Sequence, residues 1–323
     1  MTVNMPVLDL TVWRTGSPTQ RRRLAADLDS ALQESGFLMV TGHQVPDDLK
    51  AAIRHHARRF FALPDEIKQQ YATPVSGRGW IAKGREANAY FGQTADAARA
   101  DLKESYTSGR AITTGDPVVD AAWFAPNIWP SQVPELGPLC DAYTAAVEAL
   151  NTELLQICAT ALGLDPGWFV DRCSNAPYSF DITRYPAWAQ TGDAVAGQFR
   201  IAPHTDWGVL TFLDRQPGYA GLQIMTLDGQ WVDAPYAPGA FTVNVGDLLA
   251  RWTGDRWRST RHRVLPPSPQ APSEELISLV VFFEADVDTI VAPLAPPVGR
   301  VCDYPPVSAG EYLSARANAA TVA

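Results

Sequence analysis

The sequence is poor in several residue types, and each scarcity narrows what the protein can be. Of 323 residues only five are histidine and four are cysteine, so imidazole or thiolate chemistry has few candidates. The cysteines, at positions 140, 158, 173 and 302, lie far apart and form no metal-ligand pattern. This spacing predicts four reduced thiols in a cytoplasmic protein.

Long apolar runs and an excess of basic residues are also missing. No run approaches the ~20 apolar residues of a membrane helix, and the first residues show no secretory signal pattern. Lysine and arginine total 26 against 35 acidic residues, a formal net charge of −9. We therefore expect a cytoplasmic protein that binds neither nucleic acid nor a membrane. The oligomeric state stays open.

The order of the predicted elements is helices first and strands second. Helical patterns occur over 17–35, 46–61, 63–71, 134–162 and 308–320, with early strands at 6–10 and 37–41. From there on, short strands are predicted over 179–185, 198–204, 209–213, 221–225, 231–233, 241–245, 260–264 and 276–283. The stretch over 76–114 is rich in glycine and predicts loops and short strands that line a site.

Short strands at this spacing are typical of a two-sheet jelly roll, and the whole order predicts an α+β fold with the longest helix outside the strands. We expect residues 1–125 to form an N-terminal helical and mixed region. Residues 126–323 would hold the long helix, the strand core and the C-terminal helix. Both parts would form one compact unit.

A candidate metal site lies in the strand half. His204 and Asp206 are two residues apart, so on one strand they share a face, and His262 lies in a later strand pattern. Two histidines and a carboxylate that leave open positions are typical of non-haem Fe(II) oxygen chemistry. A zinc site of the same composition is the alternative. The other histidines, at 43, 55 and 56, are predicted to be structural.

The residues around these three resemble a known family. The run 204–211, His-Thr-Asp-Trp-Gly-Val-Leu-Thr, is similar to the iron motif of the isopenicillin N synthase-like family of non-haem Fe(II) and 2-oxoglutarate-dependent oxygenases. Other short segments similar to the family's sequences occur in the same order as in the family, at 36–43, 101–106, 127–130, 221–224, 229–233, 244–249, 251–253 and 259–264.

This resemblance implies a fold, a reaction and a set of ligands. The core would be a distorted double-stranded β-helix, a jelly roll, with His204, Asp206 and His262 as the iron ligands. The enzyme would use Fe(II), O₂ and 2-oxoglutarate to oxidise a C–H bond of a small-molecule metabolite by hydroxylation, desaturation or cyclisation.

The chain departs from the family at the co-substrate site. An Arg-X-Ser pair usually holds the distal carboxylate of 2-oxoglutarate, but here Leu276 stands two residues before Ser278. A leucine cannot donate to a carboxylate, so another cation is needed. We expect Tyr185, Thr183 and Ser278 at this site, with Arg200 as the candidate replacement.

Two other functions stay open, and the substrate side is less specific. The missing arginine also fits an O₂-dependent iron oxidase without 2-oxoglutarate, and a catalytically silent binding protein on this fold is the alternative from another class. The substrate-binding residues expected from the resemblance are Arg85, Tyr90, Phe91 and Phe283.

Overall fold

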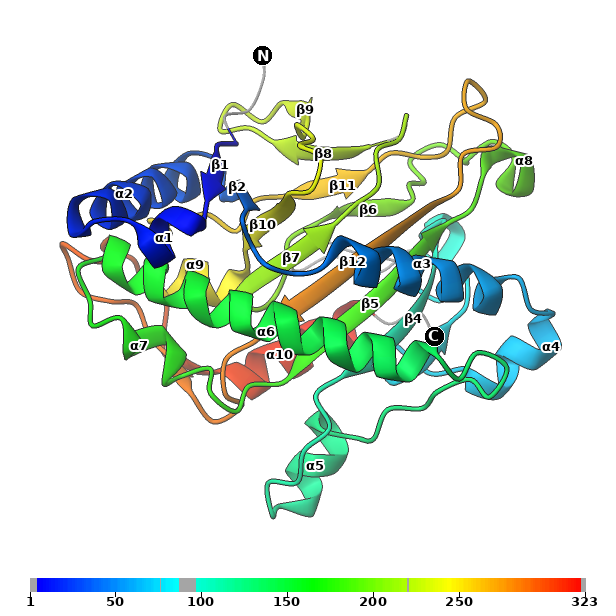
Figure 1. Cartoon of the computed structure of the whole chain (residues 1–323), viewed down its shortest axis with the longest axis horizontal. Helices are drawn as coiled ribbons and strands as arrows, with labels where there is room; N and C mark the ends of the chain where they lie inside the picture. The colour runs from blue at the N-terminus through cyan, green and yellow to red at the C-terminus, as the bar shows by residue number, and fades with distance from the viewer. Residues whose placement is uncertain (1–4, 76, 87–96, 220, 321–323) are drawn as a thin grey trace.

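The fold is that of a computed structural model, which describes residues 5–75, 77–86, 97–219 and 221–320 (Figure 1). The helices are α1 (Thr11–Thr15), α2 (Pro18–Glu34), α3 (Asp47–Phe61), α4 (Asp65–Lys68), α5 (Pro117–Trp123), α6 (Leu136–Ala161), α7 (Gly167–Val170), α8 (Trp188–Thr191), α9 (Asp247–Trp252) and α10 (Ala309–Ala320), with the 3-10 turns η1 (Gln69–Tyr71) and η2 (Ala97–Arg99). The strands are β1 (Val7–Asp9), β2 (Phe37–Thr41), β3 (Gly79–Ile81), β4 (Glu104–Gly109), β5 (Tyr178–Tyr185), β6 (Ile201–His204), β7 (Leu210–Asp214), β8 (Leu222–Met225), β9 (Trp231–Asp233), β10 (Phe241–Val245), β11 (His262–Val264), β12 (Leu276–Phe283), β13 (Ile290–Val291) and β14 (Val307–Ser308).

A large and a small sheet form the core. The large sheet has the order β1-β2-β10-β7-β12-β5-β4-β3, and the small one has the order β6-β11-β8-β9. Every pairing in them is antiparallel except that of β1 with β2. Side chains of both sheets line one shared cavity, so the sheets face each other as in a jelly roll, and the predicted fold class is confirmed.

Side chains along β12 alternate between the packed core on one face of the large sheet and the cavity on the other. Ile277, Leu279 and Val281 are fully buried, while Val280 and Phe282 line the cavity. Successive residues of a strand point to opposite faces, so one face of β12 packs on the helical layer and the other faces the small sheet. Figure 1 shows α3 and α6 crossing the packed face of the sheet.

The long helix α6 supports that packed face. Its buried residues Val147, Leu150, Leu154 and Ile157 recur at helical spacing, and burying each one contributes about 1.5–3 kcal/mol. The helix ends two residues before Gly163, whose φ of +70° is the left-handed conformation that terminates helices.

Several predicted bounds were too long and some short helices were missed. β6 begins at Ile201 rather than at 198, and β11 begins at His262 rather than at 260. The helix α5 was not predicted, although Asp116 caps it by accepting hydrogen bonds from the backbone N–H groups of Val118 and Val119. Across the described ranges of the chain, no helix has both the length and the apolar character needed to span a membrane.

Candidate active site

Three side chains able to bind a metal meet between the sheets. His204 ends β6, His262 begins β11, and the two residues are paired across these antiparallel strands. Nε2 of each histidine lies 3.5 Å from Oδ1 of Asp206, and one ligand atom from each of the three residues lies within 4.8 Å of the others. One ion can therefore contact all three side chains.

Backbone carbonyls orient both imidazole rings. Nδ1 of His204 lies 2.8 Å from the carbonyl oxygen of Ala202, and Nδ1 of His262 lies 3.1 Å from that of Thr260. Since a carbonyl oxygen can only accept, each Nδ1 donates its proton to it, and each Nε2 is the ring nitrogen that faces Asp206. This second hydrogen bond is the usual way in which a metal-ligating histidine is held. Burial opposes protonation of His204, but the Asp206 carboxylate outweighs it and raises the pKa of this histidine.

The carboxylate ligand is oriented from β10. Nδ2 of Asn244 donates to Oδ2 of Asp206 over 2.7 Å, which leaves Oδ1 facing the histidines. Burial opposes ionisation, but His262, His204 and the Asn244 amide outweigh it and lower the pKa of the Asp206 carboxyl. Burial and the neighbouring His204 lower the pKa of His262 to about 4. A charged carboxylate and a neutral imidazole are the forms that bind a metal.

A buried aspartate connects the ligand segment to the C-terminal helix. Asp247, at the start of α9, accepts hydrogen bonds from Thr205 (3.3 Å), Ser259 (2.6 Å) and Tyr312 (2.9 Å). Arg316 of α10 lies 3.6 Å from the same carboxylate and donates to Thr205 over 3.4 Å. Because Thr205 stands between His204 and Asp206, α10 is fixed directly to the segment that carries these two side chains.

A cavity of about 550 Å³ contains the three ligands. At one end it is lined by Thr183 and Tyr185 of β5, together with apolar residues of the small sheet. At the other end it is lined by Phe282, Glu284 and one side of α10. The cavity thus extends along β12 from the Tyr185 end to the Glu284 end.

Comparison with known proteins identifies this arrangement. Residues 5–132 match the profile described as the non-haem dioxygenase in morphine synthesis N-terminal domain, and residues 172–285 match the 2OG-Fe(II) oxygenase superfamily. A validamycin A dioxygenase from Streptomyces hygroscopicus subsp. limoneus is 39% identical over 97% of this chain and 86% of its own length. The chain belongs to the Fe(II)- and 2-oxoglutarate-dependent dioxygenases.

Other relatives of this dioxygenase differ in what they act on. A homoarginine-6-hydroxylase from Oryza sativa subsp. japonica is 30% identical over 88% of this chain and 86% of its own length. A full-length Neurospora crassa protein, solved in complex with alpha-KG and thymine, has a TM-score of 0.83 at 26% identity, and the match covers 98% of this chain and 96% of that one. The protein is therefore an oxidoreductase that uses Fe(II), O₂ and 2-oxoglutarate on a small molecule.

The structure brings the expected co-substrate residues together at one end of the dioxygenase cavity. Leu276 pairs with Tyr185 across β12 and β5, and Ser278 pairs with Thr183. Thr183 and Tyr185 line the cavity. Ser278 hydrogen-bonds the phenol of Tyr185.

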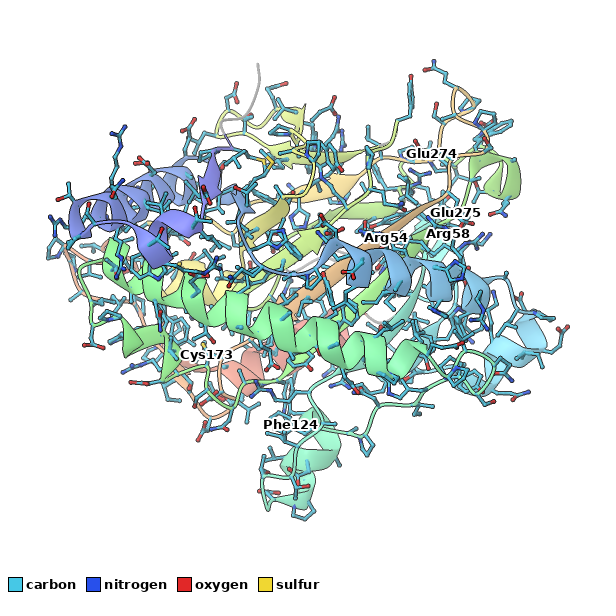
Figure 2. The ribbon with its side chains drawn as sticks, in the orientation of Figure 1. Arg54, Arg58, Phe124, Cys173, Glu274 and Glu275 are labelled. Carbon is cyan, nitrogen blue, oxygen red and sulfur yellow. The ribbon has the colours of Figure 1, made fainter. Side chains whose placement is uncertain are left out.

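Arg200 is fully buried beside this group. Its guanidinium lies 3.3 Å both from Oε1 and from the backbone carbonyl of Glu274, two residues before Leu276. The guanidinium carbon is 5.8 Å from the ring centre of Tyr185. Figure 2 labels Glu274 and Glu275 just before β12, and Oε1 of Glu275 lies 3.7 Å from Nε of Arg58 on α3.

The expected substrate residues have mixed outcomes. Tyr90 and Phe91 fall outside the described residues. Arg85 is exposed on a turn and is not among the side chains that line the cavity. Phe283 points the other way, into the core against Phe212 at 5.5 Å between ring centres, and its neighbour Phe282 lines the cavity instead.

Glu284 was not predicted, although the strand pattern contains the signal for it. Ser278 faces the co-substrate end, so Val280, Phe282 and Glu284 follow on the same face at intervals of two residues. Burial, together with the negative charges of Asp206 and Asp247, raises the pKa of Glu284 to about 8. Asn244 was also missed as a partner of Asp206, since nothing local in the sequence places β10 beside the ligands.

Proposed function

We propose that this dioxygenase binds Fe(II) through Nε2 of His204, Oδ1 of Asp206 and Nε2 of His262, and oxidises a C–H bond of a polar metabolite. The observation that carries the assignment is the convergence of these three atoms, each already oriented by a hydrogen bond at its other end. Iron with 2-oxoglutarate and O₂ supplies the oxidising power. The chain contributes ligand orientation, a cavity closed by α10, and positions for the co-substrate and the substrate.

Arg200 is our candidate for holding the distal carboxylate of 2-oxoglutarate. Its guanidinium lies close to both Tyr185 and the start of β12, where the family's arginine would stand at position 276. A planar guanidinium suits a carboxylate because it can donate two parallel hydrogen bonds. Tyr185 and Thr183, which line the cavity, would complete the site together with Ser278, which is paired with Thr183 across β12 and β5.

Lys103 is the competing cation, because it precedes β4 and lines the same cavity. Its ammonium forms an ion pair with Glu86 at 2.5 Å, and Asp181 lies near enough to stabilise its charge further. Acidic groups on more than one side of this ammonium disfavour a dianionic co-substrate. Arg200 is not among the side chains that line the cavity, and it faces a single acid, Glu274, at 3.3 Å. The Glu274 carboxylate also accepts a hydrogen bond from the backbone N–H of Tyr219, so it keeps a partner if the guanidinium turns to the co-substrate. We therefore assign the co-substrate to Arg200.

Validamycin A is the first substrate to test, since the enzyme named for it is 39% identical along nearly the whole chain. The polar and ionisable side chains of the cavity, among them Ser179 and Asp181, fit a polar molecule of this kind better than a hydrocarbon. Homoarginine, the substrate named for other relatives, is the second candidate.

An anaerobic titration followed by turnover tests the proposal. The Fe(II)-loaded protein should develop the visible charge-transfer band of the 2-oxoglutarate chelate, and succinate should form with O₂ and validamycin A. His262→Ala should bind no stoichiometric iron and show no band. A bound iron without a band would instead favour the oxidase that does not use 2-oxoglutarate, and iron retained by His262→Ala would refute the ligand set.

A further inference from the structure

The cavity end next to α10 holds a carboxyl group that the proposed chemistry does not use. Glu284 directly follows β12 and lines the cavity. Its Oε2 is buried and has no hydrogen-bond partner within the described ranges of the chain. Burying an unpaired carboxyl lowers the stability of the folded protein. No contact of Glu284 in the described structure offsets this cost.

The backbone is arranged to admit this side chain. Oε2 of Glu284 sits over Gly208, where any side chain would collide with it and with the backbone carbonyl of Phe283. Gly208 follows the ligand Asp206 by two residues, so the carboxyl stands against the metal-binding loop. Glu284 follows the last residue of β12. Tyr185, at the co-substrate end, is paired with Leu276, the first residue of this strand, so the two ends of the strand separate Glu284 from the co-substrate end.

The acidic side chains that line the cavity each have a basic partner or belong to the proposed metal site, except Glu284. Besides the histidines, the cavity is lined by four acids and two bases, namely Glu86, Asp181, Asp206 and Glu284 against Arg78 and Lys103. Lys103 is paired with Glu86, Arg78 interacts with Asp181, and Asp206 belongs to the metal site. Glu284 is left as the one cavity-lining carboxyl without a compensating cation in the described structure.

Aromatic rings stand beside this carboxyl. Phe282 shares its face of the strand, and Trp207 lines the same cavity from the loop after β6, with the guanidinium of Arg316 5.6 Å from the centre of its ring. A carboxylate next to aromatic faces is a favourable environment for an organic cation, because the ring faces are also attracted to positive charge. Because burial and the neighbouring Asp206 and Asp247 raise the pKa of Glu284, a bound cation would also favour the ionised form of this carboxyl.

We propose that Glu284 recognises a positively charged nitrogen of the substrate, an ammonium or a guanidinium, and so orients the substrate between the metal site and α10. This inference rests on the proposed function, since it places the substrate opposite the 2-oxoglutarate end. Glu284 is a specificity-determining residue in this scheme: it pairs with the substrate and takes no part in binding iron or co-substrate.

The test uses matched pairs of probes on the anaerobic Fe(II)–2-oxoglutarate protein. The cations are n-butylammonium and n-butylguanidinium, and their neutral counterparts are n-butanol and n-butylurea. Binding is read from the shift of the chelate band and from saturation-transfer NMR. Glu284→Gln removes the charge at constant shape, Glu284→Asp keeps it, and Glu311→Gln, on the exposed side of α10, is the matched surface control.

The wild type and Glu311→Gln should bind at least one cation about 10- to 100-fold more tightly than its neutral counterpart, the range expected for one charged hydrogen bond. Glu284→Gln should lose this preference while its iron content and chelate band stay unchanged, and Glu284→Asp should keep part of it. Which cation binds better tells ammonium from guanidinium. Equal binding of neutral probes, no binding of either cation, or a preference that survives Glu284→Gln would overturn the inference. Loss of the chelate band in the wild type would instead refute the proposed function.

Discussion

Replacing Arg200 tests whether Arg200 or Lys103 binds the distal carboxylate of 2-oxoglutarate. In the proposed site its guanidinium donates to the distal carboxylate of 2-oxoglutarate. Arg200→Gln removes the charge and the planar fork but keeps a polar side chain next to Glu274. A hydrogen bond to a charged group contributes about 1.5–3 kcal/mol, so losing one should raise the Kd of 2-oxoglutarate about 10- to 100-fold.

The assay is an anaerobic titration of the chelate band, followed by initial rates at varied 2-oxoglutarate. We expect a raised KM for 2-oxoglutarate and a kcat that is largely kept at saturation, because the variant changes binding at a distance from the metal. 2-Oxobutyrate is the internal control. It has the keto acid end but no distal carboxylate, so its affinity should be the same in the wild type and in Arg200→Gln.

Two further variants sharpen the result. Lys103→Gln removes the competing cation and should leave the affinity for 2-oxoglutarate within about two-fold, well below the effect of one charged hydrogen bond. Leu276→Arg, added to Arg200→Gln, should restore much of the affinity by supplying a guanidinium from β12. An unchanged Kd in Arg200→Gln, with a large loss in Lys103→Gln, would show that the assignment is wrong. Thermal unfolding of each variant checks that the change beside Glu274 has not destabilised the fold.

Three further substitutions test the structure around the ligands. Asn244→Leu removes the hydrogen bond to Asp206 and should weaken Fe(II) binding about 10- to 100-fold, measured by competition with a chelator; unchanged affinity would remove this residue from the site. Asp247→Asn weakens the charged hydrogen bonds that hold α10 and should lower the free energy of unfolding by about 1.5–3 kcal/mol, with faster hydrogen exchange in α10 as the specific sign. Gly208→Ala places a methyl group against Glu284 and should cost about 1–3 kcal/mol as overpacking; an unchanged Tm would mean that the carboxyl moves aside.

Local sequence pattern predicted most of the elements that build the cavity. The bounds of β12 and of β10 are those expected from their apolar runs, because strands buried on the packed face require a continuous or alternating apolar pattern. The helix α6 begins two residues after its predicted start and ends one residue before its predicted end. These elements depend on short-range periodicity, which a single sequence contains in full.

His204, Asp206 and His262 come together for a partly different reason from the one predicted. The two-residue spacing was expected to place His204 and Asp206 on one face of a strand, but β6 ends at His204. Asp206 reaches the histidines because the chain turns after the strand, and its backbone carbonyl accepts a hydrogen bond from the N–H of Asp247 at 2.8 Å. The pairing of His204 with His262 depends on the distant strands β6 and β11, which no local pattern reveals.

The family resemblance predicted least well the side chains that lie outside the shared motifs. Arg200 was expected on an unbroken strand, yet it precedes β6 and is held by Glu274. Phe283 was placed one residue out of register, and in a strand one residue reverses the face. Glu284 lies outside any motif. Only the alternation of side chains along β12, which puts Glu284 on the same face as Ser278, could have identified it.

The edges of the large sheet set the order in which this protein can be made. Val40 of β2 pairs with Phe241 of β10, about 200 residues further along the chain, whereas at the opposite edge β3 pairs with the nearby β4. During synthesis the apolar run Phe37–Thr41 therefore leaves the ribosome long before its partner strand exists. Such distant pairing slows folding and leaves apolar segments exposed in the meantime. β2 therefore stays without its β10 partner until late in synthesis, and we expect the yield of folded protein to depend on how this apolar strand is protected in the interval.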